Sequence, residues 1–384
     1  MKLADFLETK PLYYDKIDLS RMPRAYAMVR PHLNLGEVVH LVGTNGKGST
    51  GRILASLLKE AGYRVGHYSS PHILRFNERI WIDGADAEDR RLEAAHRTLM
   101  SWLGSECAEE LSYFEYTTLL ALTAFEGCDF VVFEAGLGGE FDATNVVDKV
   151  LSVVTPIGID HQAFLGDSIT QIAETKIRSI QKEALVAPQP APEVYETAKR
   201  IAKAKGARLL TPEGVLGKAV RRSILDTAVS IGWPLYLGEN AVAAFAAAKR
   251  LTHRDYDPEM LASIQLKGRF ERILPNVILD VGHNPLGARA VAEALDGRTP
   301  VLVYNALEDK DVVQILEILQ PVIRRLEIIP IESERAIAEE RLAEAAAKLG
   351  IEAGPFRGLR EEEEYLVFGS FIVAEAFLKS LHET

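Results

Sequence analysis

The sequence predicts an α/β protein whose two domains are each built around a mainly parallel sheet. Short apolar runs alternate with helical patterns along the chain, in two successive series. The length of 384 residues exceeds what one hydrophobic core usually holds, so two domains are expected. Hydrophobic residues make up 47% and charged residues 26%, as in an ordinary soluble globular protein.

The first series predicts a domain over residues 1–267. Its short apolar runs end in loops rich in Gly, Asp or Pro, as buried parallel strands do when helices cover both faces of the sheet. Strands are predicted over Val38–Val42, Phe130–Glu134 and Val150–Thr155. Helices are predicted over Lys47–Ala61, Ser168–Arg178 and Glu239–Leu251.

The second series starts after the Gly-Arg turn at residues 268–269 and predicts a smaller domain over residues 268–384. Strands and helices alternate again, which indicates another parallel α/β sheet. Strands are predicted over Val277–Asp280, Val301–Tyr304, Leu326–Pro330 and Tyr365–Phe368. Helices are predicted over Leu286–Leu295, Val312–Leu319 and Arg335–Leu349.

Charge and composition exclude several classes of partner. The formal net charge is −11 and no long Lys/Arg run is present, so no nucleic-acid partner is expected. No stretch of about 18 apolar residues occurs, and MKLADFLETK at the N-terminus lacks the apolar core of a signal peptide, so no membrane association is expected. Cys107 and Cys128 form neither a metal knuckle nor a disulfide framework, which fits a reducing cytoplasm.

The segment GTNGKGST has the order strand, glycine-rich loop, helix that phosphate binding needs. Glycines let successive backbone N–H groups converge on an oxyanion, and the helix N-terminus adds its dipole. Lys47 can neutralise phosphate charge, and a following hydroxyl can ligate Mg²⁺. Leu41 and Gly48 break the strict G-x-x-x-x-G-K-[ST] pattern, and a glycine-rich turn capping an ordinary helix is the alternative. The predicted nucleotide loop consists of Gly43, Thr44, Asn45, Gly46, Lys47, Gly48, Ser49 and Thr50.

This loop resembles the variant phosphate loop of the Mur ligase superfamily, and its GKGS ending is typical of the folylpolyglutamate synthase and dihydrofolate synthase branch. The resemblance implies a P-loop ATPase domain followed by a smaller Rossmann-like domain. It also implies an ATP-dependent ligase that activates a carboxylate as an acyl phosphate and joins it to the amine of L-glutamate. Later motifs extend the resemblance over roughly residues 18–375.

Two motifs imply ligands for Mg²⁺ beside the hydroxyl of Ser49. YSSPHILRFNERI at residues 68–80 resembles a family block in which the serine before the proline belongs to a Mg²⁺ site, here Ser70. Glu134 ends an apolar strand, where a carboxylate faces the phosphate loop in P-loop proteins. Ala135 and Glu140 depart from the family, which usually has Val and Arg there.

The block TPIGIDHQAFLGDSITQIAETK at residues 155–176 resembles the family pattern D-H-x-x-x-L-G-x-[TS]-x-x-x-I-A-x-E-K, with Thr175 in place of Glu. The resemblance implies that His161 is a ligand of a second Mg²⁺ and that Lys176 carries an N-carbamate. Carbamylation turns an ammonium into an anionic oxygen donor, which explains a lysine beside a divalent metal. Ile177 and Arg178 replace the family's Ala-Gly.

Motifs in the second half of the chain imply contacts with ATP. Asn240 in GENAVAAFAAA matches a nucleotide contact, and Arg269 in GRFE matches an arginine that reaches the phosphates. An arginine at a hinge is suited to stabilise charge on a transferred phosphoryl group. DVGHNP implies a ribose contact by Asp280 and places His283 near the reacting groups, although a simple strand-end turn before a helix is the alternative.

Two motifs imply the substrate site. SYFEYTT resembles a family block that meets a pterin, so Phe114 is expected to stack on the heterocycle and Glu115 to accept from its N–H groups. The alternative is a helix start with core aromatic residues. The D-A-T-N segment is implied to line the same region with Asp142, Ala143, Thr144 and Asn145, and RMPR at residues 21–24 is a further candidate.

The expected reaction joins L-glutamate to dihydropteroate, to a reduced folate (poly)glutamate, or to both, with Lys47, His161, Lys176, Arg269 and His283 in the catalytic centre and two Mg²⁺ ions. Positioning and electrostatics supply most of such catalysis. A Mur-type ligase acting on a cell-wall precursor and a P-loop ATPase used for switching or transport are the alternatives. The resemblance implies a monomer.

Overall fold

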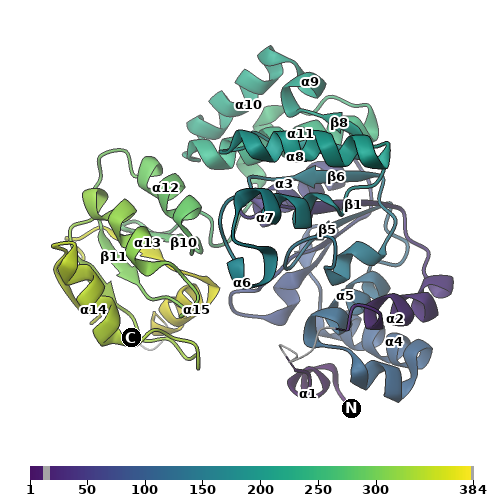
Figure 1. The fold of residues 1–384 in the computed structure, drawn as a ribbon, viewed down its shortest axis with the longest axis horizontal. Coiled ribbons are helices and arrows are strands. Elements are labelled where there is room, and N and C mark those ends of the chain that lie inside the picture. Colours follow the sequence, from purple (N-terminus) through teal and green to yellow (C-terminus); the bar gives the residue numbers. More distant parts are fainter. Residues whose placement is uncertain (12–17, 382–384) are drawn as a thin grey trace. The chain divides into compact units, whose positions relative to one another are not determined.

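The computed structural model describes residues 1–11 and 18–381 and is mixed α/β with two mainly parallel sheets, as predicted (Figure 1). Contacts divide the chain into two compact units. Unit 1 comprises Met1–Gly158, Leu165–Thr227 and Glu239–Ile264. Unit 2 comprises Ile159–Phe164, Ala228–Gly238 and Gln265–Thr384. Within the described residues, none of the helices combines the length and apolar character needed to cross a bilayer.

The sheet of unit 1 has eight strands in the order β4-β3-β2-β5-β1-β6-β7-β8. The strands from β2 to β8 in this order are parallel, whereas β3 and β4 are antiparallel additions at one edge. Their bounds are β1 Glu37–Val42, β2 Val65–Tyr68, β3 Ile80–Ile82, β4 Ala85–Asp86, β5 Phe130–Glu134, β6 Leu151–Val154, β7 Glu183–Val186 and β8 Arg208–Leu210.

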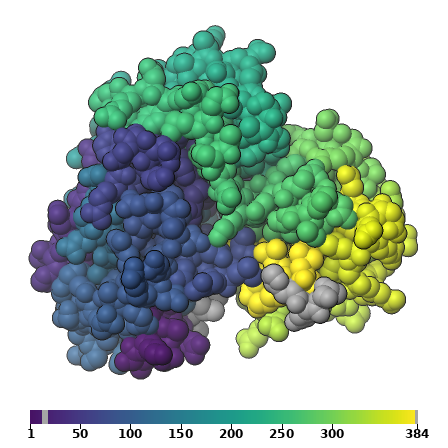
Figure 2. Space-filling view, turned by 180° about the vertical axis from the view of Figure 1, so that it is seen from behind, coloured from purple at the N-terminus to yellow at the C-terminus, as the bar shows by residue number. Residues whose placement is uncertain are grey.

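Helices pack on this sheet through buried apolar clusters. One cluster joins the sheet to α2, α4 and α5, and the other joins β6 and β7 to α7 and α8. The short α1 lies beside α4 in both views and buries Leu3, Phe6 and Leu7 (Figure 1, Figure 2). The helices up to residue 264 are α1 Leu3–Glu8, α2 Arg21–Val29, α3 Lys47–Glu60, α4 Asp89–Glu110, α5 Tyr113–Ala124, α6 Gln162–Leu165, α7 Ile169–Ile177, α8 Pro192–Lys205, α9 Pro212–Leu216, α10 Lys218–Ser230 and α11 Leu235–Thr252. Short 3₁₀ helices are η1 Arg30–His32, η2 Phe76–Arg79, η3 Ala143–Val146 and η4 Pro258–Ser263.

The sheet of unit 2 has six strands in the order β13-β12-β11-β14-β10-β9, of which β9 is antiparallel to its neighbour. An apolar cluster fills the space between this sheet and α12, α13 and α14. The strands are β9 Glu271–Leu274, β10 Val277–Asp280, β11 Val301–Tyr304, β12 Leu326–Ile328, β13 Ala353–Pro355 and β14 Tyr365–Phe368. The helices are α12 Pro285–Ala294, α13 Val312–Leu319, η5 Gln320–Val322, α14 Glu339–Lys348 and α15 Phe371–Ser380.

Most predicted elements are confirmed, and the errors lie at their ends. The strand predicted over Leu326–Pro330 ends at Ile328, and the helix predicted from Arg335 begins at Glu339. Residues 335–337 instead pair with the segment after β11, because the Arg335 carbonyl accepts from Glu308 and the Ile337 amide donates to Ala306. Helical φ/ψ is incompatible with that pairing, so the helix starts later.

A charged cluster beside β12 and β14 makes the stability of unit 2 sensitive to acid. Arg325 donates one 2.6 Å bond to each oxygen of the buried Glu363 carboxylate, and the Tyr365 hydroxyl donates a third bond at 3.1 Å. The bonds from Arg325 lower the pKa of Glu363 from 4.5 to about 2. A lowered carboxylate pKa adds stability above the unfolded-state pKa of 4.5, and this stability is lost as the pH falls towards 2.

We therefore expect Glu363→Gln to lower the melting temperature by about 3 °C at neutral pH, because the bidentate pair with Arg325 is lost. The difference in melting temperature between this variant and the unmodified protein should become smaller as the pH falls from 4.5 to about 2. Thermal melts across this pH range measure it, with the exposed Glu362→Gln as the control. A difference that stays constant with pH would contradict the assignment.

Candidate active site

The glycine-rich loop lies between β1 and α3 and requires glycine at two positions. Gly46 has a φ of +83°, and a Cβ there would lie 2.5 Å from the Asn240 Oδ1 atom. Gly43 has a φ of +155°, and a Cβ there would lie 1.9 Å from the Thr155 hydroxyl oxygen. The side chains of Thr155, just after β6, and of Asn240 on α11 therefore lie directly against the loop. The predicted nucleotide contact Asn240 lies against the loop residue Gly46.

Backbone hydrogen bonds divide this loop into an anchored half and a half whose amides lie at the start of α3. The amides of Thr44 and Asn45 both donate to the Pro156 carbonyl, at 2.9 and 3.1 Å. The Thr44 hydroxyl adds bonds to the carbonyl and amide of Gly158 at 3.1 Å. The first-turn amides of α3 have no partner inside their own helix, so residues 46–49 are the natural donors to an anion.

Charged and hydroxyl side chains surround this helix N-terminus. The Lys47 Nζ donates to the carbonyls of Gly43 and Thr44 at 3.2 Å and lies 3.9 Å from the Glu134 carboxylate. Glu134 ends β5 and is buried. The hydroxyls of Ser49 and Thr50 are buried without a hydrogen-bond partner among the described residues. A buried hydroxyl is costly without a partner, and hydroxyl and carboxylate oxygens are ligands that Mg²⁺ accepts, so these residues fit a phosphate with Mg²⁺.

Lys176 on α7 reaches the same loop. Its side chain is only 4% exposed, and its Nζ donates to the Gly43 carbonyl at 2.9 Å. The predicted residues Lys47 and Lys176 thus meet at one carbonyl of the phosphate loop. Ser70 follows β2, which pairs in parallel with β5, so Ser70 and Glu134 lie at the same edge of the sheet.

The pterin candidates on α5 take part in local structure. Glu115 forms a capping box with Ser112, and its carboxylate also accepts from Arg21 at 2.8 Å. The Phe114 ring packs over Gly136, where a Cβ would lie 2.5 Å from the ring. The helix-start interpretation of this motif therefore describes its local structure. The ion pair between Arg21 and Glu115 also brings the RMPR segment to the N-terminus of α5.

The D-A-T-N segment is held by its own side chains. The Asp142 carboxylate accepts from the Leu137 amide at 2.7 Å and from the amide and hydroxyl of Thr144 at 2.9 and 2.5 Å. Burial raises the pKa of Asp142, and these hydrogen bonds oppose the rise. His40, which is fully buried on β1, bonds the Thr144 hydroxyl at 2.7 Å.

Both polar atoms of the Asn145 side chain also form hydrogen bonds within the protein. Its Oδ1 accepts from the buried Lys149 ammonium, and its Nδ2 donates to the Glu140 carbonyl at 2.8 Å. Ala143, which lies between Asp142 and Thr144, is buried at the start of the 3₁₀ helix η3. The polar atoms of this segment mainly fix the loop that follows β5.

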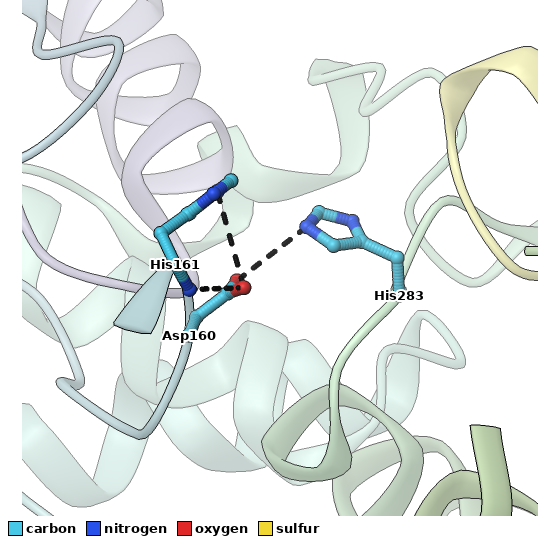
Figure 3. Close-up of side chains that lie close together, drawn as sticks. All are labelled: Asp160, His161 and His283. Atoms are coloured by element: carbon cyan, nitrogen blue, oxygen red, sulfur yellow. Dashed lines mark hydrogen bonds and ion pairs between the residues drawn. The ribbon is translucent and has the colours of Figure 1, made fainter. Parts of the chain in front are cut away.

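Unit 2 gathers the two predicted catalytic histidines, His161 and His283, around one carboxylate (Figure 3). The His161 and His283 Nε2 atoms lie 3.9 and 3.6 Å from the Asp160 oxygens. Lys310 donates to Asp160 at 2.9 Å and the Asn284 amide donates at 3.0 Å. His161 has a left-handed φ of 50°, which turns its side chain back towards Asp160.

Electrostatics describe this group as an ion-pair cluster. Burial would raise the pKa of Asp160, but the bond from His283 and the charges of His161, His283 and Lys310 hold this pKa far below its usual range. The ammonium of Lys310 lies against the oxygen that a cation would need. Asp160 therefore orients the two histidines and Lys310.

Asp280 and Arg269 lie close together in the same unit. Asp280 ends β10 and accepts from the Tyr236 hydroxyl at 2.7 Å, the Phe270 amide at 2.9 Å and the Gly282 amide at 2.7 Å. The Arg269 guanidinium lies over the Phe371 ring at 5.0 Å. The turn interpretation of DVGHNP is thus correct locally, because Asn284 caps α12 and Pro285 opens it.

Several residues of the site have no sequence signal of their own. Asp160 stands inside the motif at residues 155–176, but its pairing with Lys310 joins residues far apart in the chain. His40, Lys149 and Gln189 lay in segments without a motif. Only the three-dimensional contacts reveal them.

Comparisons with known proteins identify relatives of this chain. No model of a protein family matches the chain. A curated relative from Escherichia coli (strain K12), named dihydrofolate synthase/folylpolyglutamate synthase, is 36% identical over 335 residues, covering 80% of this chain and 76% of the relative. The solved structure of E. coli FolC in complex with DHPP and ADP is similar, with a TM-score of 0.85 and 30% identity, over 100% of this chain and 98% of that chain.

A third similarity concerns a metal-bound protein. The bifunctional folylpolyglutamate synthase/dihydrofolate synthase from Yersinia pestis, complexed with AMPPNP and a Mn ion, has a TM-score of 0.82 and 28% identity, over 99% of this chain and 97% of that chain. The identity and coverage of these relatives, together with the phosphate loop and its lysines, show that this chain is a ligase that belongs to the dihydrofolate synthase/folylpolyglutamate synthase family.

Proposed function

We propose that this enzyme uses ATP to join L-glutamate to dihydropteroate, to folate (poly)glutamates, or to both, through an acyl phosphate. The observation that carries the proposal is the phosphate loop, where Lys47 and Lys176 both donate to the Gly43 carbonyl, Lys47 lies near Glu134, and the buried hydroxyls of Ser49 and Thr50 have no partner among the described residues. The P-loop ATPase alternative assigns no role to Lys176, the second lysine that contacts this loop. The relatives bound to ADP, AMPPNP and DHPP support nucleotide and folate-like substrates.

The nucleotide is proposed to contact the loop and three residues beyond it. The amides of residues 46–49 and Lys47 would hold the phosphates, with Asn240 packed over the loop. Arg269 would offset charge on the transferred phosphoryl group, and Asp280 would meet the ribose. Phe114, Glu115 and the segment 142–145 would shape the pterin end, mostly through the loop that they hold in place.

Two divalent sites are proposed. Ser49, Ser70 and Glu134 would supply oxygen ligands for one ion, and His161 with Lys176, as an N-carbamate, would supply ligands for the other. Bound Mg²⁺ would neutralise phosphate charge. The Mn-containing relative supports use of a divalent metal, and the count of two rests on the motifs.

The reaction begins when a substrate carboxylate oxygen attacks the γ-phosphorus of ATP and ADP leaves. Lys47 holds charge at the phosphates while the loop amides fix their position. The glutamate amine then attacks the acyl carbon, phosphate departs with the former carboxylate oxygen, and the amine loses a proton. His161 and His283, held by Asp160, are proposed to lie near the reacting groups.

We further propose that the two predicted domains have different roles. Residues 1–267 would bind ATP and the pterin, and residues 268–384 would form the glutamate-ligating domain. The partners are small molecules, and we expect a cytoplasmic monomer, in keeping with two unpaired cysteines, one buried and one half-buried.

A side-by-side assay tests the proposed function. The protein is incubated with ATP, Mg²⁺ and L-glutamate, with either dihydropteroate or tetrahydrofolate as acceptor, and phosphate release and product mass are followed. Glutamate-dependent release with at least one acceptor is expected, and the pattern decides between one activity and both. Release that ignores glutamate with both acceptors would refute the proposal.

Gly46→Ala should weaken ADP binding about thirtyfold. The new Cβ would be forced into left-handed backbone and would lie 2.5 Å from Asn240 Oδ1, which displaces the loop from its anion-binding form. Calorimetric titration with ADP measures the effect. The control is Gly62→Ala, which also has a positive φ of +93° but lies just after α3 with open space around its Cβ position. Unchanged ADP affinity in Gly46→Ala would place the nucleotide elsewhere.

A further inference from the structure

Gln189 lies in the loop between β7 and α8. The backbone hydrogen bonds between β6 and β7 have ended there, and the Gln189 side chain bonds the backbone of both segments instead. The last ladder bonds join the amide of Thr155 to Val42 and the amide of Ala187 to Val154. Beyond them, the Gln189 Oε1 accepts from the Ile157 amide at 2.9 Å. Its Nε2 donates to the carbonyls of Thr155 and Ala187 at 3.1 and 3.0 Å.

The amide orientation of Gln189 is fixed by these partners. A backbone N–H must meet an oxygen and two carbonyls must meet N–H groups, so only one flip satisfies all three. Neither Met nor Glu can do the same, because Met offers no hydrogen bond and Glu offers only acceptors. Glutamine is therefore specifically suited to this position.

The segment that Gln189 holds is the anchor of the phosphate loop. Pro156 lies between Thr155 and Ile157, and its carbonyl accepts the amides of Thr44 and Asn45. Pro156 has no N–H with which to fasten itself to β7. The Thr155 hydroxyl also lies against Gly43, so a shift of this segment moves both ends of the anchored half of the loop.

We propose that Gln189 is a positioning residue that sets the geometry of the phosphate loop through Thr155–Ile157. The inference rests on nucleotide binding as proposed above and on no assumption about the folate. Without the side chain, the Ile157 amide and the Thr155 carbonyl lose their partners. The Pro156 carbonyl then moves, and the amides of residues 46–49 no longer converge on one anion.

A matched control lies at the other end of the same two strands. Gln181 precedes β7, and its Oε1 accepts from the Lys149 amide at 2.9 Å, just before β6 begins. Gln181→Met therefore removes a side chain-to-backbone bond between the same strands at the edge far from the loop. It reports the stability cost of such a bond without the positioning effect.

The test compares Gln189→Met with Gln181→Met by titration with ADP and with AMP, alongside thermal melts. Gln189→Met should raise the Kd for ADP about tenfold and that for AMP less than about twofold, because the loop grips the second phosphate. Gln181→Met should leave both within about twofold. A wild-type affinity for ADP in Gln189→Met, or equal losses in both variants or for both nucleotides, would overturn the inference.

A second variant covers the case in which Gln189→Met does not fold. Gln189→Glu keeps the side-chain volume and the bond from Ile157 but loses both donated bonds, and it should raise the Kd for ADP at least threefold, roughly, with little loss of AMP affinity. Unchanged ADP binding here also overturns the inference. If the unmodified protein fails to bind ADP, the proposed function fails. If the unmodified protein binds ADP and the Gln189 variants bind it with the same affinity, only the inference about Gln189 fails.

Discussion

Lys47→Ala is expected to lower glutamate-dependent phosphate release by about a thousandfold or more while the protein stays folded. The ammonium lies between two loop carbonyls and 3.9 Å from Glu134, at the N-terminus of α3. No other side chain in the loop carries positive charge, and phosphoryl transfer depends on such charge being in place. Initial rates with saturating ATP measure the loss.

The control for this variant lies on the same helix. Lys59 is 40% exposed at the end of α3 and pairs with Glu60 on the surface, so Lys59→Ala should keep the full rate. A Lys47→Ala enzyme that retained a tenth of the wild-type rate would show that the loop does not hold the transferred phosphate.

Lys176→Ala should lower the rate about a hundredfold, and short carboxylic acids should restore part of it. Lys176 is buried beside Gly43, so its replacement opens a space next to the phosphate loop. If the lysine works as an N-carbamate, acetate or propionate can bring an anionic oxygen to that space. Rates are measured against acid concentration at constant ionic strength.

The Lys47→Ala variant checks the specificity of this rescue. The same acids should not restore its activity, because it lacks a cation and a carboxylate supplies only an anion. A large loss without rescue would remove the carbamate from the account and keep the ligase assignment. Full activity in Lys176→Ala would contradict the proposed role of the lysine altogether.

The fold was predictable wherever burial leaves a continuous apolar signal. Phe130–Glu134, Val277–Asp280 and Val301–Tyr304 are strands with the predicted bounds, because helices cover both faces of a parallel sheet. β2 gave no such signal because it contains Gly66 and His67. A Cβ at Gly66 would lie 2.3 Å from the Phe125 ring, so tertiary packing selects that glycine in a strand.

The site was predictable where chemistry is local in sequence and unpredictable where partners are distant. Lys47 and the two carbonyls that it bonds lie within one motif, whereas Lys176 reaches the Gly43 carbonyl from 133 residues further along the chain. In contrast, the carboxylate of Asp142 and the amide of Asn145 hold their own segment, through partners that include Lys149. Sequence spacing cannot show that a polar group is already satisfied.

Long-range pairing also explains why Asp160 escaped notice. Its partners Asn284 and Lys310 lie 124 and 150 residues further along the chain. Contacts group residues 159–164 with unit 2, although β6 before them and α7 after them belong to unit 1. No linear boundary in the sequence encodes that grouping.

The central claim is that ATP activates a carboxylate, and transfer of heavy-isotope oxygen tests it most directly. The acceptor substrate is labelled in its reacting carboxylate, and the phosphate released during ligation is analysed by mass spectrometry. An acyl phosphate requires one labelled oxygen to pass from the carboxylate to phosphate for each amide formed. Phosphate that carries no label while amide accumulates would contradict the account.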